Sequence, residues 1–297
     1  MKNYSSVLII CNPNAMRGKI DEVLPHIKKR LSLRYSKVDS ITSQSDDGAE
    51  ELANKNAGKY DIILSCGGDG TLHQVVNGVM QTEFRPLIGI LPYGTCNDVA
   101  RTLKIPFKLD KAIDCVLRLN TTNYDLMTDG TTFISYSLAT GYLTKVSYSA
   151  KSNLKKKVGR FAYVLSALKY IFKFNSLPFT ITADGERIHG KFAYIMLINS
   201  ESVGGFLLNK GENLHNGMFK LVLIKQTKFK IGSFFNFLKI FIRGIRRLKN
   251  SKNVIVKDVK NVIIENHSNE PFALDGEKIK FLRKEINTNT SLTFIKK

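Results

Sequence analysis

Tryptophan is absent from this sequence, and cysteine and histidine are scarce, with four cysteines and five histidines among 297 residues. The cysteines stand at positions 11, 66, 96 and 115 and form no Cys-x-x-Cys pair. A chain of this length can bury a sufficient core without disulfide bonds. The histidines are scattered, without the spacing of metal ligands. We therefore expect neither a disulfide-stabilised protein nor a zinc site, and the free thiols indicate a reducing cytoplasm.

Acidic residues and long apolar runs are also in short supply. No apolar run free of charges is long enough to cross a membrane, and no signal peptide is recognisable, so we expect any membrane contact to be peripheral. Asp and Glu number 25 against 45 Lys and Arg, which gives a formal net charge of +20. Such a balance favours an anionic partner, and charge alone leaves nucleic acid, a polyphosphate and an acidic membrane surface open.

A glycine-rich segment at residues 61–71 is the most informative part of the sequence. It reads Asp-Ile-Ile-Leu-Ser-Cys-Gly-Gly-Asp-Gly-Thr, an apolar strand pattern that runs into glycines. A helical stripe follows at Leu72, Val75, Val76 and Val79. Glycines before a helix N-terminus are typical of a phosphate-binding loop, and a carboxylate there needs a divalent cation such as magnesium beside the phosphates. The alternative is an ordinary Asp-Gly turn between a strand and a helix.

A second strand and loop have the same construction. The apolar run at 87–91 is followed by Pro92-Tyr-Gly-Thr-Cys-Asn-Asp98 and a helical pattern. In an open α/β sheet, ligands bind at the carboxyl ends of the strands, so two such loops favour one shared site. Together the loops resemble the signature of the diacylglycerol and sphingoid lipid kinases. The resemblance continues with Asn12-Pro13 and with an Asp-Gly-Glu near the C-terminus, and it covers nearly the whole chain.

This resemblance implies an ATP- and magnesium-dependent kinase that phosphorylates a hydroxyl group of a membrane lipid, diacylglycerol or a related lipid. ATP and Mg²⁺ are the implied cofactors. The residues that would bind the nucleotide are Asn12, Ser43, Gly67, Gly68, Gly70, Thr71, Gly94, Thr95 and Asn97. Asp69, Asp98 and Asp125 resemble the acidic trio that holds the magnesium through ordered waters. Asp98 is equally explained as a helix-start residue with Arg101 three positions later.

The catalytic base is harder to place, because Asp-Gly-Glu occurs twice, at Asp184 to Glu186 and at Asp275 to Glu277. Both copies lie between expected strands, where Asp-Gly is a favoured hairpin turn. The residues themselves leave the two copies undecided. In the family that the chain resembles, the base lies in the copy near the C-terminus, which implies Asp275 as the base and Glu277 as its acidic neighbour.

The order of strand and helix patterns predicts the fold class. Alternation over the first part predicts an α/β domain with a Rossmann-like parallel sheet, which we assign to residues 1–125 as the nucleotide-binding kinase domain. From residue 131 the strand patterns cluster, which predicts an antiparallel β-sandwich at 126–297 as the lipid-substrate domain. Its expected strands are 133–138, 179–182, 192–199, 219–225, 254–256, 262–265, 272–274 and 292–295. Helical patterns interrupt them at about 154–174 and 231–248.

The second helical pattern lies in a basic region. Residues 225–252 contain nine Lys or Arg and no acid, and Phe234, Leu238, Phe241, Ile245 and Leu248 form one helical stripe. A cationic amphipathic helix suits an anionic membrane surface, so we expect the protein to lie peripherally on the inner face of the membrane. Packing of the same stripe on the sandwich is the alternative. A homodimer is also left open.

Several other functions compete with the lipid kinase. An NAD kinase-like enzyme shares Gly-Gly-Asp-Gly, but the 92–98 loop and the basic helix favour the lipid kinase. A catalytically silent lipid-binding relative is suggested by His73-Gln74, where many relatives carry Asn-Glu, and by Asn216, where bacterial relatives often carry a metal-binding Asp. We expect no nucleic-acid partner, since aromatic residues do not interleave with the basic runs. The acceptor lipid stays open.

Overall fold

The computed structural model describes residues 4–15, 18–44, 48–141, 176–211, 213–228, 230–248 and 252–297. The helix expected at 154–174 lies outside the described residues. The chain divides into two compact units. Unit 1 contains Met1–Leu126 together with Thr290–Lys297, and unit 2 contains Met127–Asn289. The last eight residues therefore belong with the N-terminal part, and the functional division at residue 125 stays a proposal.

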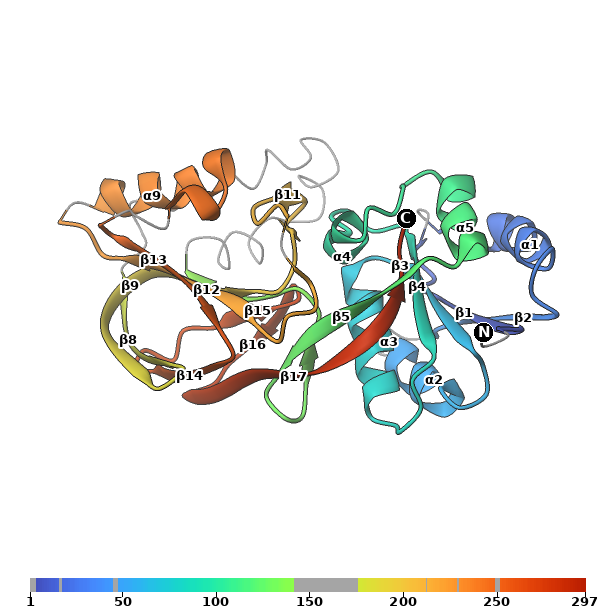
Figure 1. Cartoon of the computed structure of the whole chain (residues 1–297), viewed down its shortest axis with the longest axis horizontal. Coiled ribbons are helices and arrows are strands. Elements are labelled where there is room, and N and C mark those ends of the chain that lie inside the picture. Colours follow the sequence, from blue (N-terminus) through green and yellow to red (C-terminus); the bar gives the residue numbers. More distant parts are fainter. Residues whose placement is uncertain are drawn as a thin grey trace. The chain divides into compact units, whose positions relative to one another are not determined.

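Unit 1 is built around a parallel sheet with the strand order β2-β1-β3-β4 (Figure 1). These strands are β1 (Ser6–Cys11), β2 (Lys37–Thr42), β3 (Ile62–Gly67) and β4 (Leu87–Pro92). Every residue of β3 and β4 is buried. Strands covered by helices on both faces need apolar side chains at every position, which explains the continuous apolar runs of the sequence.

Helices cover this sheet, with α2 and α3 together below it in Figure 1 and α1 and α5 above it. Their bounds are α1 (Ile20–Leu31), α2 (Gly48–Asn56), α3 (Asp69–Met80), α4 (Asp98–Thr102) and α5 (Leu109–Arg118). Helices α2 and α3 pack closely because Gly78 has no side chain, and a Cβ there would lie 2.1 Å from the Glu50 carbonyl oxygen. Arg30 of α1 bonds Asp110 and Asp114 of α5 at 2.9 and 2.8 Å.

Unit 2 consists mainly of antiparallel strands. They are β6 (Phe133–Ile134), β7 (Ser137–Gly141), β8 (Leu177–Ala183), β9 (Glu186–Ile198), β10 (Ser202–Val203), β11 (Phe206–Leu207), β12 (Phe219–Lys225), β13 (Val254–Val259), β14 (Asn261–Asn266), β15 (Phe272–Leu274) and β16 (Glu277–Ile279). Two further strands, β5 (Thr121–Thr128) and β17 (Arg283–Ile295), have residues in both units. The expected strand at 133–138 is two short strands, and that at 292–295 is the end of the longer β17.

Alternation along β9 supplies two apolar cores of unit 2. Strand β9 pairs with β7 and β12 over its second half. Ile195 and Leu197 enter one core with residues of β8, β14 and β15. Tyr194 and Met196 enter the other core with residues of α9 (Lys230–Arg243). The fold class expected from the sequence, a parallel α/β sheet followed by antiparallel strands, is confirmed.

Helix α9 differs from the expected helix at 231–248. It ends at Arg243 because Gly244 adopts a left-handed φ of 76° and donates its N–H to the carbonyl of Ile240 at 2.9 Å. A short 3₁₀ turn, Arg246–Leu248, follows. Of the expected stripe, Phe234, Ile245 and Leu248 are buried and Leu238 is half-buried, and Phe237 and Ile240 are buried in addition. The side chain of Phe241 lies outside the described part of the structure.

Candidate active site

Hydrogen bonds beyond the strand ends gather several candidate residues of unit 1 at one edge of the sheet. Ser43 donates its N–H to the carbonyl of the last residue of β1 at 2.9 Å. Asn12, which follows β1, donates to the Cys66 carbonyl of β3 at 3.0 Å, and Tyr93, which follows β4, donates to the Gly67 carbonyl at 2.8 Å. The segments after all four parallel strands are therefore joined, as the strand-and-loop pattern predicts.

The two glycine loops touch through their backbones. A Cβ added to Gly94 would lie 2.4 Å from the Cα of Gly68, and one added to Gly68 would lie 3.0 Å from the Cα of Gly94. A Cβ on Gly67 would lie 2.4 Å from the hydroxyl oxygen of Thr71. Glycine is needed at these positions because a side chain would collide with the neighbouring atoms, and not because the backbone is left-handed. The loops at 67–71 and 92–98 thus form one structural group.

Asp69 fastens the second loop to the first. Its Oδ2 accepts the N–H of Asn97 at 2.7 Å, and its Oδ1 accepts the N–H of Asp98 at 2.6 Å. Asn97 adopts a left-handed φ of 51°. Its Oδ1 accepts the N–H of Gly94 at 2.9 Å, and its Nδ2 donates to the Gly94 carbonyl at 2.8 Å. Asp69 and Asn97 therefore shape the site, a role that the sequence pattern did not reveal.

The start of α3 has the features of an anion site. The first hydrogen bond within the helix runs from the N–H of Leu72 to the Gly68 carbonyl at 3.1 Å. The N–H groups of Asp69, Gly70 and Thr71 precede this bond and add to the positive end of the helix dipole. Gly68 and Gly70 are half-exposed, and Thr95 of the second loop is exposed. This arrangement fits the phosphate groups of a nucleotide.

The three acidic residues expected to hold magnesium are only partly gathered. Asp69 and Asp98 meet through the hydrogen bond between the two loops, and Asp98 is 1% exposed. Asp125 is also buried, on β5. In the described part of the chain, no three Asp, Glu, His or Cys side chains are close enough to form a metal-binding group. A magnesium ion would thus need ordered waters as further ligands, as the resemblance implies.

Asp275, the expected base, lies in the turn between β15 and β16 of unit 2 and is 2% exposed. Its carboxylate accepts three backbone N–H groups, from Ser135 at 2.6 Å, Tyr136 at 2.9 Å and Ser137 at 3.0 Å. These donors lie in the segment between β6 and β7 and at the first residue of β7, so the carboxylate holds that segment in place. Glu277, its expected acidic neighbour, is exposed on β16.

The other copy of Asp-Gly-Glu has nearly the same backbone. Asp184 and Asp275 both have φ of 47°, followed by glycines with φ of 87° and 94°. Asp184 accepts the N–H groups of Lys260 at 3.0 Å and Asn261 at 2.8 Å. Asp184 is exposed, however, whereas Asp275 is buried. Burial, and not turn geometry, separates the two copies.

Two further features of the nucleotide loops emerge from the structure. The hydroxyl of Tyr93 is buried without a hydrogen-bond partner among the described residues, and burial raises its pKa. A ligand group could satisfy such a hydroxyl. Cys11 and Cys66 are fully buried neighbours on β1 and β3, and the hydrogen bond with Cys11, together with burial, raises the pKa of the Cys66 thiol. Cys96 is half-exposed in the second loop.

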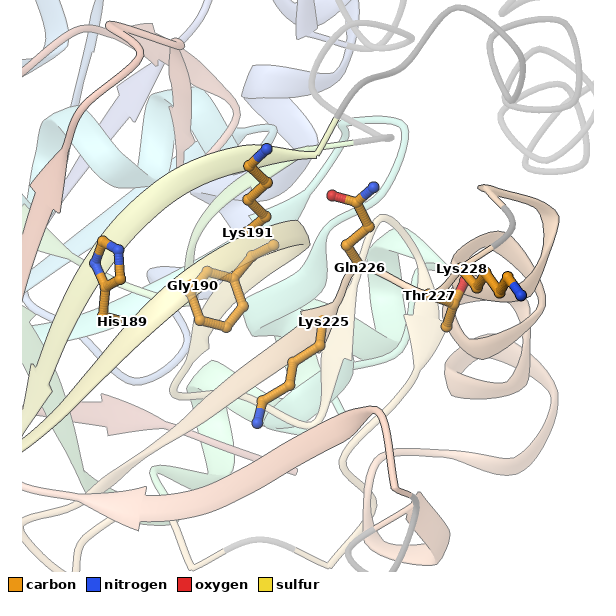
Figure 2. Close-up of a pocket in the computed structure, with 8 residues that line it drawn as sticks. His189, Gly190, Lys191, Lys225, Gln226, Thr227 and Lys228 are labelled. Atoms are coloured by element: carbon orange, nitrogen blue, oxygen red, sulfur yellow. The ribbon is translucent and has the colours of Figure 1, made fainter.

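A separate pocket of about 460 Å³ lies on unit 2 (Figure 2). Its lining residues are His189, Gly190, Lys191, Phe192, Lys225, Gln226, Thr227 and Lys228. Figure 2 shows that the side chains of Lys191 and Lys225 point in opposite directions and that Lys228 extends away from both. The three cations do not converge on one point, so this basic pocket is not arranged as a phosphate-binding cradle.

Comparisons with known proteins agree with this geometry. Residues 6–128 match the model of the diacylglycerol kinase catalytic domain. A diacylglycerol kinase from Staphylococcus haemolyticus is 30% identical over 271 residues, which are 91% of this chain and 81% of that protein. One from Staphylococcus carnosus is 28% identical, with 91% and 87% covered. The crystal structure of a diacylglycerol kinase from Bacillus anthracis has a TM-score of 0.80 at 21% identity, covering 100% of this chain and 98% of that one. The chain belongs to the diacylglycerol kinase catalytic domain family.

Proposed function

We propose that this protein is an ATP- and Mg²⁺-dependent lipid kinase that phosphorylates the hydroxyl of diacylglycerol or a related lipid. The family is a kinase family that uses ATP, and its relatives above are named diacylglycerol kinases. The observation that carries the proposal is the pair of glycine loops joined through Asp69 at the start of α3. A second candidate function has no comparable observation in its favour.

In this proposal the chain holds the phosphates of ATP with backbone groups. The N–H groups at the start of α3 would bind phosphate oxygens, and Asn12, Ser43, Thr71, Thr95 and Asn97 would line or shape the nucleotide site. Asp69, Asp98 and Asp125 would hold Mg²⁺ through waters. When bound, the ion supplies positive charge to the transferred phosphoryl group. Hydrogen bonds within the chain join the two loops, which reduces the cost of ordering them when a nucleotide binds.

Asp275 is the proposed base, with Glu277 as its acidic neighbour. An ionised carboxylate has about four lone-pair positions, and three backbone donors occupy three of them here. In the proposal this carboxylate accepts the proton of the lipid hydroxyl. The same backbone donors fix the orientation of the carboxylate, which a positioned base requires.

The proposed lipid substrate and the charge of the chain both favour a reaction at a membrane surface. We propose peripheral association with an anionic membrane surface at the cytoplasmic face, and no nucleic-acid partner. The formal net charge of +20 supports this surface. The oligomeric state stays open, and a homodimer is one of the states to be tested.

Radiolabelled ATP tests the reaction. The purified protein would be incubated with Mg²⁺ and mixed micelles that contain diacylglycerol, a monoacylglycerol, a sphingoid base or an undecaprenyl-type alcohol, and in parallel with NAD. We expect label in a lipid phosphate, and its loss when EDTA removes Mg²⁺. Label in NAD and in no lipid would replace the proposal by an NAD kinase. No transfer to any acceptor, with ATP still bound, would indicate a silent relative.

A further inference from the structure

Helix α9 has a well-packed inner face. Phe234, Phe237 and Ile240 are buried in a core of unit 2. The ring of Phe237 meets that of Tyr194 edge-on at a centroid distance of 5.0 Å. These contacts already satisfy the apolar stripe that holds the helix on the strands, so apolar residues on the opposite face need another explanation.

The outer face of α9 exposes large apolar side chains between cations. Phe235 is 52% exposed and Ile242 is 72% exposed. Lys239 lies between them, at the i+4 position from Phe235 with Ile242 at i+7, so the three share one helix face. Arg243 is exposed beside them. An aromatic, an aliphatic and two basic side chains on one face are typical of a helix that lies in a membrane interface.

Basic residues also lie in the segments that flank the helix at both ends. At the N-terminal end, the Thr227 N–H donates to the Ser233 hydroxyl at 2.9 Å, which holds the lysine-rich segment 225–228 against the first turn. Lys225 and Lys228 in Figure 2 belong to this segment. At the other end, Arg246 and Arg247 are exposed on the 3₁₀ turn. The whole stretch 225–252 contains no acidic residue.

We propose that the outer face of α9 lies in the interface of an anionic bilayer, with Phe235 and Ile242 among the upper acyl chains and Lys239 and Arg243 at the lipid phosphates. The inference rests on the proposed function in one respect, that the substrate is a membrane lipid. With 14 residues the helix is about 21 Å long, which suits lying along the interface. None of the helices in the described residues is long and apolar enough to span a membrane.

Charge favours a lipid surface over a second copy of the chain as the occupant of this face. A second copy would bring the same net charge of +20 and the same cations to the contact, and like charges at an interface oppose association. Anionic headgroups pair with those cations, and each basic residue near such a surface contributes about 1 kcal/mol.

The absence of tryptophan makes a direct test available. Phe235→Trp and Ile242→Trp each place a single fluorophore on the outer face, and Leu33→Trp, at a site that is 77% exposed in unit 1, is the matched control. With vesicles of phosphatidylglycerol and phosphatidylcholine, we expect the emission at 235 and 242 to shift to the blue and to be quenched by brominated acyl chains. The control should show neither change. Unchanged emission at both outer positions would overturn the proposal.

Serine variants measure the contribution of the face. Phe235→Ser and Ile242→Ser should each lower partition onto these vesicles about tenfold. Serine has no large apolar side chain, so the favourable transfer of such a side chain from water into the bilayer is lost. Leu33→Ser should not. A blue shift that rises with protein concentration in the absence of lipid, together with a doubled mass, would instead assign the face to a second copy.

Kinase activity separates this inference from the proposed function. Detergent micelles with a short-chain diacylglycerol present substrate without a bilayer, so the serine variants should keep the turnover of the unmodified protein there. If no lipid is phosphorylated but the tryptophans still enter the bilayer, the kinase proposal fails and the membrane surface stands. If lipid is phosphorylated and the tryptophans stay in water, the kinase proposal stands and the membrane surface on α9 fails.

Discussion

Three Asp-Gly turns show how one residue pair takes different roles through its surroundings. The glycines after Asp129, Asp184 and Asp275 all have positive φ, and each aspartate accepts backbone N–H groups near its turn or from a neighbouring segment. Asp184 is exposed, Asp275 is buried among backbone donors, and Asp129 is half-buried beside a lysine. The chemistry of each carboxylate follows from these contacts, since desolvation and donors determine what it can bind.

The two matched copies of Asp-Gly-Glu allow a controlled test of the base. We expect Asp275→Asn to reduce turnover about 10²- to 10⁴-fold, because asparagine cannot accept the proton. The variant also turns an NH₂ toward a backbone N–H, at a cost of about 1–3 kcal/mol of stability. Urea unfolding must therefore accompany the turnover assay. Asp184→Asn should retain turnover. If both variants lost turnover in proportion to the shift of their unfolding midpoints, Asp275 would not be the catalytic base.

Asp129 predicts a dependence of stability on pH. Burial acts to raise its pKa, but Lys284 and the donors of Thr131 and Thr132 outweigh it and lower the pKa to about 2 from the ordinary value of 3.8. A lowered pKa contributes stability that is present above about pH 4 and is lost as the pH falls toward 2. We expect Asp129→Asn to lose about 2 kcal/mol at pH 7 relative to the unmodified protein, and the difference to shrink toward pH 2. A difference that is the same at both pH values would contradict this account.

At the scale of elements, the contact between the glycine loops predicts that position 94 cannot accept even a methyl side chain. Gly94→Ala would place a Cβ 2.4 Å from the Gly68 Cα, so the loops must separate. We expect loss of nucleotide binding by calorimetry at ATP concentrations that saturate the unmodified protein. Gly190→Ala is the matched control, because its Cβ meets Phe192 at an ordinary 3.6 Å. If both variants bind ATP normally, the close approach of the loops is not needed for the nucleotide.

The cysteines report on the same loop. Cys96 is half-exposed, while Cys11, Cys66 and Cys115 are buried. We expect a thiol reagent to modify Cys96 first and to block activity, and Mg-ATP to slow the reaction, as peptide mapping and activity assays would show. A Cys96→Ser variant that is inactivated at the same rate would exclude this position as the cause.

At the scale of the whole molecule, the net charge of +20 should govern association with membranes. Salt shortens the Debye length from about 10 Å at 0.1 M to about 3 Å at 1 M. We expect the fraction of protein that sediments with anionic vesicles to fall at least about fivefold over this range, whereas ATP binding to backbone N–H groups persists. If the protein bound uncharged vesicles as strongly as anionic vesicles, insertion of apolar side chains would dominate over charge.

Local patterns account for much of unit 1 and of its candidate site. The apolar runs of β3 and β4 and the helical stripe of α3 are repeats within a few residues, and their loops were identified from glycine content. Helix α5 and strand β5 were not foreseen, although both are well formed. The return of the C-terminus to unit 1, where Phe294 pairs with Ile88 of β4, is a contact across about two thirds of the chain, which no local repeat encodes.

By itself, the sequence determined the α/β order, the two glycine loops and the positive charge, because backbone propensity and side-chain periodicity act between near neighbours. Tertiary structure alone decided which Asp-Gly is buried, that Asp69 joins the loops, and which face of α9 stays exposed. Each of these outcomes depends on segments that lie far apart in the chain, such as Ser135 to Ser137 beside Asp275. Burial and hydrogen-bond partners arise from packing, and packing exists only once the chain has folded.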